Sequence, residues 1–287
     1  MGFENLVPQT RINPDADRYG ERCLERSRAV ATTMSCAMDV EYGPEPEHRL
    51  DVWMPGGAGP SGGAPVLVFF HGGGFTHGYK EWCGFMAPAL APSLLVAVRY
   101  RLMPGVAYPA PMLDAVAAVA WLRSHIATYG GDPDRLVVGG HSAGGAIAAC
   151  LRTRPDWLAA HGLGPEAIAG AACLSTTFHA FAVSGTAGGA YALAAGPLPL
   201  DPESPLARVP AATGPFFIAW GGRERQRERV ERSSMALITA LRDRGQQADW
   251  IFQEDADHFG THLALADIRH PLSAALRAWL IRVTTRR

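Results

Sequence analysis

Residues 139–145 read Gly-Gly-His-Ser-Ala-Gly-Gly, which is the strongest indication of the fold in the sequence. The apolar run 136–138 precedes it, and a run of small residues suited to a helix, 146–149, follows it. Strand, Gly-x-Ser-x-Gly and helix in this order form a nucleophile elbow, a sharp turn that leaves room only for small neighbours. The pattern predicts that Ser142 projects as a nucleophile at the carboxyl edge of a sheet, with a helix N-terminus directed at its reaction centre. The alternative is a glycine-rich turn with an incidental serine.

A second glycine-rich stretch lies 70 residues upstream of the elbow. Residues 66–70, Val-Leu-Val-Phe-Phe, have the composition of a strand buried on both faces, and His-Gly-Gly-Gly follows at 71–74. Glycines leave backbone N–H groups uncovered, and such donors stabilise a tetrahedral oxyanion. A phosphate loop would instead end in Gly-Lys-Ser/Thr, which is missing here. We therefore expect the N–H groups of Gly73, Gly74 and Ala143 to form an oxyanion hole.

A serine nucleophile requires a base, and the base requires an acid that orients it; in this type of elbow the chain order is Ser, Asp or Glu, then His. His258 comes directly after the last predicted strand, 250–252, and from there it can reach Ser142 over the sheet edge. His262 and His270 compete for the role, but both lie deeper in a predicted helix. The sequence therefore predicts His258 as the base.

The acid is expected in the loop after the predicted strand 216–220, where the sequence continues Gly-Gly-Arg-Glu at 221–224. Glu224 is the predicted acid, because a glutamate can hold the imidazole tautomer as an aspartate does. Its extra methylene requires a slightly retracted loop. The opposing interpretation is that this charge-rich run is the solvated start of a helix. The other candidate carboxylates are Glu228, Asp255 and Asp257.

These motifs resemble those of the α/β-hydrolases, and most closely those of the hormone-sensitive-lipase-like carboxylesterases. The matching residues are 71–75, 100–104, 114, 120–122, 130–136 and 140–145. Residues 42–44 and 48–52 also resemble kynurenine-formamidase-like enzymes, although Gly74 stands where that branch has a bulkier residue. The carboxylesterases usually have an aspartate as the acid, so Glu224 departs from their pattern.

The resemblance implies a serine hydrolase that cleaves carboxylic esters with small or medium acyl chains through an acyl-enzyme on Ser142. It implies no metal and no organic cofactor, and it gives His71 the role of supporting the glycine loop. An arylformamidase-type amidase with the same triad and a biosynthetic acyl-transferring enzyme are the alternatives. From a different class, a catalytically silent binding protein on the same scaffold also stays open.

Strands alternate with helical stripes along the chain, which predicts one α/β domain over 1–287 with a mostly parallel, doubly wound sheet and helices on both faces. Residues 175–214, rich in Gly, Ala, Pro and Ser, interrupt this alternation and suggest a small cap. In the resembled esterases an N-terminal helix, here within 14–34, forms part of such a cap. The candidate substrate-contacting aromatics are Phe75, Trp82 and Phe178, for which a place in the core is the alternative.

Composition narrows the range of partners. The 287 residues carry 26 Lys and Arg against 27 Asp and Glu, so no nucleic acid or anionic membrane is indicated as a partner. The five cysteines lack metal-type spacing and are interpreted as reduced thiols. Residues 1–12 lack an apolar signal core, and no run is long enough to span a membrane. We expect a cytoplasmic protein that acts on a small-molecule ester or amide; the oligomeric state stays open, with a homodimer among the options.

Overall fold

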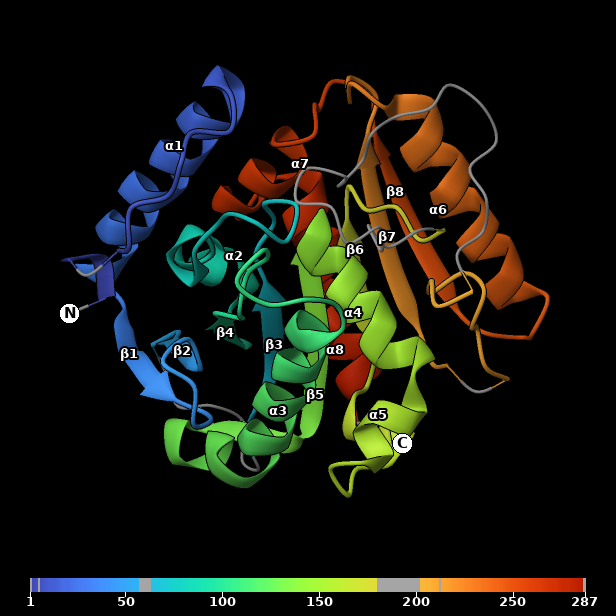
Figure 1. Ribbon diagram of the computed structural model, residues 1–287, viewed down its shortest axis with the longest axis horizontal. Helices are drawn as coiled ribbons and strands as arrows, with labels where there is room; N and C mark the ends of the chain where they lie inside the picture. The colour runs from blue at the N-terminus through green and yellow to red at the C-terminus, as the bar shows by residue number, and fades with distance from the viewer. Residues whose placement is uncertain (1, 5, 57–62, 180–201, 212, 286–287) are drawn as a thin grey trace.

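The computed structural model describes residues 2–4, 6–56, 63–179, 202–211 and 213–285. Within these residues, eight strands form one sheet in the order β1-β2-β4-β3-β5-β6-β7-β8 (Figure 1). The strands are β1 (Ser35–Glu41), β2 (Arg49–Met54), β3 (Ala64–Phe70), β4 (Leu94–Val98), β5 (Gly131–His141), β6 (Ala171–Leu174), β7 (Phe216–Gly221) and β8 (Ala248–Gln253). Strand β2 pairs antiparallel with β1 and β4, and every other neighbouring pair is parallel. The prediction of a mostly parallel sheet is confirmed.

Helices cover both faces of this sheet, as predicted. The α-helices are α1 (Pro14–Ala31), α2 (Ala87–Leu90), α3 (Ala110–His125), α4 (Ala143–Thr153), α5 (Pro155–Ala159), α6 (Arg227–Arg242), α7 (Gly260–Leu263) and α8 (Pro271–Thr284). Short 3-10 turns are η1 (Gly2–Glu4), η2 (Lys80–Trp82), η3 (Gly84–Met86), η4 (Ile126–Tyr129), η5 (Pro165–Ala167) and η6 (Ala264–Ala266). In the described part of the chain, none of these helices combines the length and apolar character needed to cross a lipid bilayer.

Side chains of β3 divide the core into two layers, because successive residues of a strand point to opposite faces. Val68 and Phe70 pack in the cluster that also contains the buried residues of α3, α4 and α6. Leu67 and Phe69 pack in the cluster with α1, α2 and α8. All four side chains are fully buried, which explains why this strand is a continuous apolar run rather than an alternating one.

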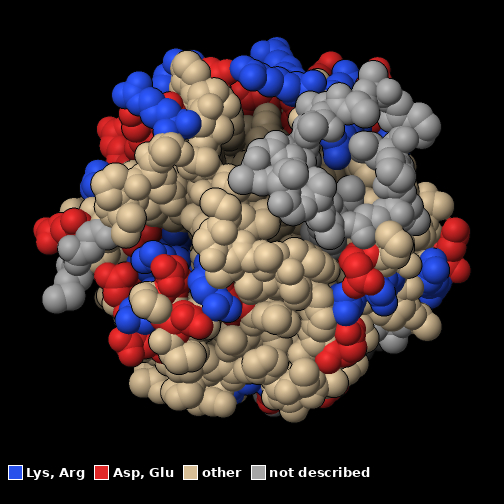
Figure 2. Space-filling view, in the orientation of Figure 1, with Lys and Arg blue, Asp and Glu red and all other residues tan. Residues whose placement is uncertain are grey.

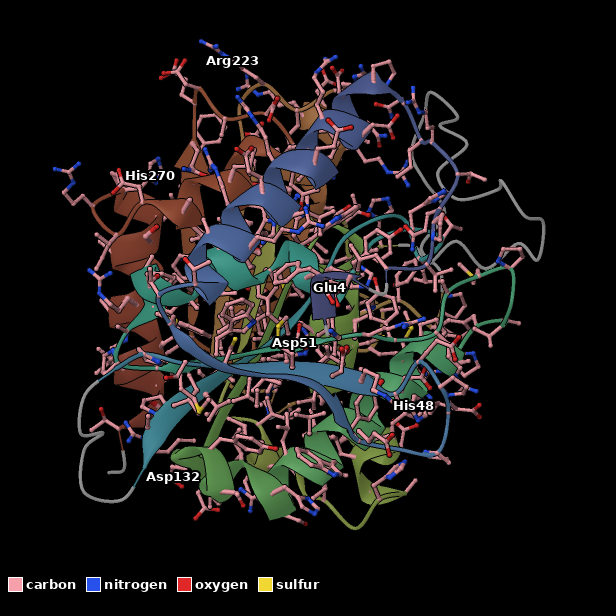
Figure 3. The ribbon with its side chains drawn as sticks, turned by 90° about the vertical axis from the view of Figure 1, so that its left-hand side faces the viewer. Glu4, His48, Asp51, Asp132, Arg223 and His270 are labelled. Atoms are coloured by element: carbon pink, nitrogen blue, oxygen red, sulfur yellow. The ribbon has the colours of Figure 1, made fainter. Side chains whose placement is uncertain are left out.

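The parallel strands end together at one edge of the sheet. Figure 3 shows this polarity: Asp132, near the start of β5, and Arg223, just after β7, lie at opposite ends of the molecule. Two backbone hydrogen bonds continue the pairing one residue past the strand ends. The N–H of Ser142 donates to Leu174 at 2.8 Å, and the N–H of Ser175 donates to Ala219 at 2.8 Å. The residues that follow β5, β6 and β7 are therefore neighbours.

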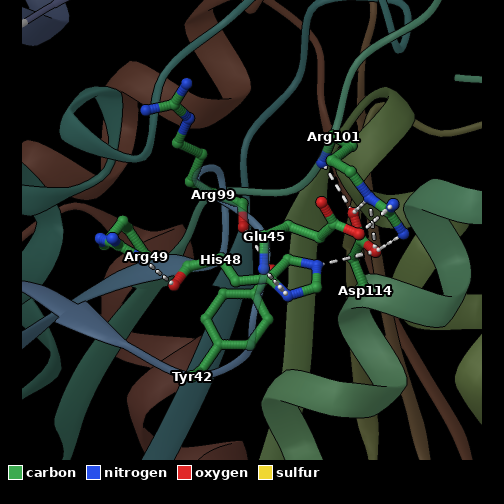
Figure 4. Close-up of polar contacts among 7 residues, drawn as sticks. All are labelled: Tyr42, Glu45, His48, Arg49, Arg99, Arg101 and Asp114. Carbon is green, nitrogen blue, oxygen red and sulfur yellow. Dashed lines mark hydrogen bonds and ion pairs between the residues drawn. The ribbon is translucent and has the colours of Figure 1, made fainter. Parts of the chain in front are cut away.

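A buried ionic cluster holds the segment that follows β4 (Figure 4). Asp114, on α3 and 1% exposed, accepts the backbone N–H of Arg101 at 2.8 Å and its guanidinium Nη2 at 2.6 Å. Nε2 of His48 lies 3.0 Å from the same carboxylate, and Glu45 pairs with Arg101 at 3.1 Å. The cluster lies outside the cleft described below and ties α3 to the loop before β2 and to the segment after β4.

Candidate active site

Ser142 occupies the sharp turn between β5 and α4. Its backbone has φ 53° and ψ −118°, a conformation that a residue with a side chain adopts only where the surrounding structure enforces it. The backbone N–H donates to Leu174, and the carbonyl accepts the hydroxyl of Thr176 at 3.1 Å and the N–H of Ala146 at 3.2 Å. These contacts fix the turn from β6 and from the first turn of α4. The local geometry is that of the predicted elbow.

Gly144 explains why the turn needs small residues. A Cβ atom at this position would collide with the backbone carbonyl of Phe70, the last residue of β3. Backbone at the end of a central strand cannot retreat without breaking the sheet, so only glycine fits. The absence of a side chain lets α4 begin directly against the strand that leads into the glycine loop.

The predicted oxyanion donors belong to two segments, the glycine loop after β3 and the start of α4. Gly73 has φ +117° and accepts the N–H groups of Thr76 and His77, which closes a tight turn. Gly74 lines the same cleft as Ser142. Ala143 is the first residue of α4, and N–H groups of a helix's first turn have no partner within the helix.

His71 lies beneath this loop rather than in the cleft. It is 1% exposed, its Nδ1 donates to the carbonyl of Gly72 at 2.7 Å, and its own carbonyl accepts the hydroxyl of Tyr100 at 2.8 Å. Burial lowers the pKa of His71 to about 4, so the imidazole is neutral near pH 7. These contacts hold the start of the glycine loop.

His258 and Glu224 face each other across the loops that follow β8 and β7. Nδ1 of His258 lies 3.1 Å from Oε2 of Glu224. The glutamate side chain is 1% exposed and the histidine side chain is 34% exposed. When the imidazole proton is on Nδ1, facing the carboxylate, the other ring nitrogen, Nε2, can accept a proton.

The competing histidines have other partners. His262 is fully buried on α7, where its Nδ1 bonds the hydroxyl of Tyr19 at 2.7 Å, and burial lowers its pKa to about 3. His270 caps α8, and its Nδ1 accepts the N–H of Leu272 at 3.2 Å. Of the three predicted candidates, only His258 lines the cleft.

The competing carboxylates also have other positions. Glu228 is exposed in the first turn of α6, and Asp255 is exposed and pairs with Arg223. Asp257 lines the cleft, but its Oδ1 accepts the N–H of Gly260 at 2.6 Å. Among the predicted acids, Glu224 alone has a contact with His258 in the described structure.

Both oxygens of Glu224 have partners. Oε1 accepts the N–H of Gly221 at 2.9 Å and the hydroxyl of Ser175 at 2.8 Å, while Oε2 faces His258. Ser175 is a site residue that the sequence analysis did not single out. The available signal was its position directly after β6, at the same sheet edge as the elbow.

These residues line one cleft of about 280 Å³. Two ion pairs lie at its mouth: Arg225 pairs with Asp15 at 2.7 Å, and Arg223 pairs with Asp255. Charged side chains of both signs lie around the upper edge of the face in Figure 2. The lining residues are Asn13, Asp15, Gly74, Ser142, Ser175, Thr177, Arg223, Glu224, Arg225, Gln226, Val230, Asp257, His258 and Phe259.

The three candidate aromatics do not belong to this lining. Phe75, Trp82 and Phe178 are 3%, 7% and 0% exposed and pack in the two core clusters. The structure therefore favours the core position that the sequence analysis gave as the alternative. Within the described residues, no group of three or more His, Cys, Asp and Glu side chains is arranged to hold a metal ion.

The two predicted cap segments are described to different extents. The N-terminal one, 14–34, contains α1, whose start contributes Asn13 and Asp15 to the cleft. In the other, 175–214, residues 180–201 and 212 lie outside the described residues. Its first residues, Ser175 and Thr177, line the cleft.

Comparison with known proteins agrees with this architecture. The profile of the family described as alpha/beta hydrolase fold matches residues 67–260, which is more than half of the chain. The chain belongs to the α/β-hydrolase family. The matched range contains the glycine loop, the elbow and the loops that carry Glu224 and His258.

Curated relatives of this α/β-hydrolase include named esterases. A probable isoprenylcysteine alpha-carbonyl methylesterase of Arabidopsis thaliana is 36% identical over 113 residues, 39% of this chain and 23% of the relative. Esterase LipI of Mycobacterium tuberculosis is 39% identical over 127 residues, 38% of this chain and 39% of the relative. The match thus spans well under half the length of these relatives.

Solved structures share the fold over nearly the whole chain. The Pyrobaculum calidifontis esterase has a TM-score of 0.67 and 19% identity, and the match covers 99% of this chain and 98% of that one. Esterase LipW of Mycobacterium marinum has a TM-score of 0.68 and 22% identity, with 98% and 96% covered. At these identities, the likeness shows the fold alone.

Proposed function

We propose that this α/β-hydrolase cleaves carboxylic esters through an acyl-enzyme on Ser142, with His258 as the base and Glu224 as the acid. The observation that carries the proposal is the 3.1 Å contact between His258 Nδ1 and Glu224 Oε2 in the cleft that Ser142 also lines. The esterase names of the relatives support the ester as substrate. The position of this carboxylate–histidine pair in the same cleft as Ser142 favours a catalytic protein over a silent binding scaffold.

In the proposed mechanism, His258 takes the hydroxyl proton while Ser142 Oγ attacks the ester carbonyl carbon. The N–H groups of Gly73, Gly74 and Ala143 stabilise the oxyanion that forms. The intermediate collapses, the carbon–alkoxy bond breaks, and His258 gives its proton to the leaving alcohol. Water then attacks the acyl-enzyme with help from the same histidine, which releases the acid and restores the serine.

The dimensions of the cleft support a small or medium acyl chain. Its volume is about 280 Å³, which limits the length of acyl chain that the cleft can enclose. We therefore expect short acyl esters to be the better substrates.

The test compares p-nitrophenyl esters from acetate to decanoate with the wild type and Ser142→Ala. We expect Ser142→Ala to lose activity by at least about a thousand-fold and to lose labelling by a fluorophosphonate, with the wild-type rate highest for the short chains. Ser234→Ala is the matched control, because this buried hydroxyl on α6 has no hydrogen-bond partner among the described residues. Full activity in Ser142→Ala would refute the proposed nucleophile.

The same preparation distinguishes the other reactions of this scaffold. A higher kcat/KM for aryl formamides than for aryl esters would make the protein an amidase of the formamidase type. Preferential transfer of the acyl group to an added alcohol or amine would make it an acyl-transferring enzyme. Each of these outcomes leaves the triad in place and changes only the substrate class.

A further inference from the structure

Ser175, at the end of β6, connects the loop after β7, which carries Glu224, with the loop after β8, which carries His258. Its hydroxyl lies 2.8 Å from Oε1 of Glu224 and 2.6 Å from the hydroxyl of Thr261. Ser175 is 2% exposed and Thr261 is fully buried, so water does not compete for these bonds. Thr261 stands three residues after His258, whose carbonyl lies 3.0 Å from the threonine hydroxyl.

The direction of these hydrogen bonds follows from the donors available. An ionised carboxylate can only accept, so the hydroxyl proton of Ser175 goes to Glu224. Thr261 has a single hydroxyl proton, and both the Ser175 oxygen at 2.6 Å and the His258 carbonyl at 3.0 Å lie within reach of it. The Ser175 hydroxyl therefore directs a donor at Oε1, the carboxylate oxygen that does not face His258.

The Ser175 donor matters because of the conformation of the loop that carries Glu224. The side chain of Glu224 folds back toward β7, since Oε1 accepts the N–H of Gly221, three residues earlier in the chain. A glutamate has one more rotatable bond than an aspartate, and that bond lets the carboxylate turn away from the imidazole. Two donors on Oε1, from β7 and from β6, fix the rotation of the carboxylate and leave Oε2 for His258.

The backbone of Ser175 is strained to make this contact. Its φ is +49°, in the left-handed region that residues other than glycine rarely adopt. Its N–H is bonded to Ala219, which holds the residue between β6 and β7. Residues with a strained backbone cluster at functional sites. In Ser175 the strained backbone carries a buried hydroxyl that has two hydrogen-bond partners.

We propose that Ser175 is a positioning residue that holds the Glu224 carboxylate in the orientation in which it faces His258. This inference rests on the proposed function, because it concerns the same triad. Ser175 does not take part in bond making; it acts through the acid. Its loss affects the rate of the chemical step and leaves ester binding largely unchanged.

The experiment measures kcat, KM and the pH profile of p-nitrophenyl acetate hydrolysis for Ser175→Ala and Ser175→Gly. Both lack the hydroxyl, but glycine accepts the positive φ, so a loss common to both belongs to the hydroxyl and not to backbone strain. We expect kcat to fall roughly ten- to a hundred-fold with KM within about two-fold of the wild type. The pH profile of each variant is recorded so that kcat is compared at the pH optimum of that variant.

A double-mutant cycle separates positioning from a general structural role. In a Glu224→Ala background, Ser175→Ala is expected to change kcat by less than about two-fold, because the group through which it acts is gone. An equal loss in both backgrounds, or a Ser175→Gly variant with wild-type kcat, would overturn the inference. If the wild type is active and depends on Ser142 while the Ser175 variants are unaffected, only this inference fails. An activity that survives Ser142→Ala removes the proposed function and this inference together.

Discussion

His141, the residue before the elbow serine, bonds the backbone carbonyl of His258 with its Nε2 at 2.7 Å. A carbonyl accepts, so Nε2 carries the proton and the tautomer of His141 is set. Burial holds the pKa of His141 well below its ordinary value, with the nearby His258 as a further cause. A neutral, buried imidazole on the elbow therefore holds the loop that carries the proposed base.

Replacing His141 with leucine is expected to lower kcat roughly ten-fold or more, because the loop around His258 loses a fixed anchor. Glutamine retains an N–H donor at the end of its side chain, so His141→Gln should keep more activity than His141→Leu. Steady-state kinetics on p-nitrophenyl acetate checks the order, with melting temperatures as the control for folding. Equal activity of the two variants would contradict the role of the donor.

Glu224 gives the sharpest test of the proposed triad. Glu224→Gln preserves the size of the side chain but removes its charge, and we expect kcat to fall roughly a hundred- to ten-thousand-fold. Glu224→Asp keeps the charge but shortens the side chain, so the carboxylate cannot both accept the Gly221 N–H and reach His258. We expect an intermediate loss for this variant. Glu228→Gln, an exposed change in the first turn of α6, is the matched control and should keep full activity.

Much of the fold could be predicted because its main signals are local. The buried runs that become β3, β4 and β5 are apolar on both faces, and glycines follow two of them directly. The antiparallel pairing of β1 and β2 was not predicted. The residues of β1 are only partly buried or exposed, so its sequence carries a weaker pattern. The direction of an edge strand depends on its pairing partner, which periodicity does not encode.

The candidate site also contains residues that local sequence predicts and residues that it does not predict. Ser142, Glu224 and His258 each follow a strand with a recognisable sequence, and strand order then determines that they share an edge. Tyr19 and Ser175 depend on packing between distant segments: the hydroxyl of Tyr19 bonds a residue 243 positions later in the chain. The sequence carries no pattern that points to the Tyr19 contact, and for Ser175 it gives only a position directly after β6. The aromatic candidates do not line the cleft. Sequence alone does not distinguish an aromatic residue in the core from one in a binding pocket.

Gly144→Ala should damage both the elbow and the stability of the fold. The added Cβ would collide with the carbonyl of Phe70, and neither α4 nor β3 can shift without disturbing the sheet. We expect a loss of esterase activity together with a lower melting temperature. Gly56→Ala is the control, since a Cβ there meets no atom of the described residues within 4 Å and Gly56 has no positive φ. A fully active and fully stable Gly144→Ala protein would contradict the close packing of α4 on β3.

Three buried histidines predict a loss of stability in mild acid. Burial lowers the pKa of His71 to about 4 and of His262 to about 3, and it lowers the pKa of His141 well below 6.5. The unfolded chain binds protons at these residues below about pH 6.5, whereas the folded chain does not. The free energy of unfolding therefore falls as the pH drops from about 6.5 toward 4, by up to about 1.4 kcal/mol per pH unit for each histidine. Asp51 opposes this trend, because burial raises its pKa to about 6 and its protonation favours the folded state.

Urea denaturation between about pH 7 and about pH 5 checks the predicted slope. His262→Phe is the informative variant, because the imidazole is stacked on Phe69 at a ring-centroid distance of 5.4 Å and an interplanar angle of 8°. A phenyl ring can keep that stacking but cannot take up a proton. The variant loses the bond to the Tyr19 hydroxyl, which lowers stability by a similar amount at every pH. Its free energy of unfolding should therefore depend less steeply on pH than that of the wild type, and an unchanged slope would show that His262 is not among the groups that titrate on unfolding.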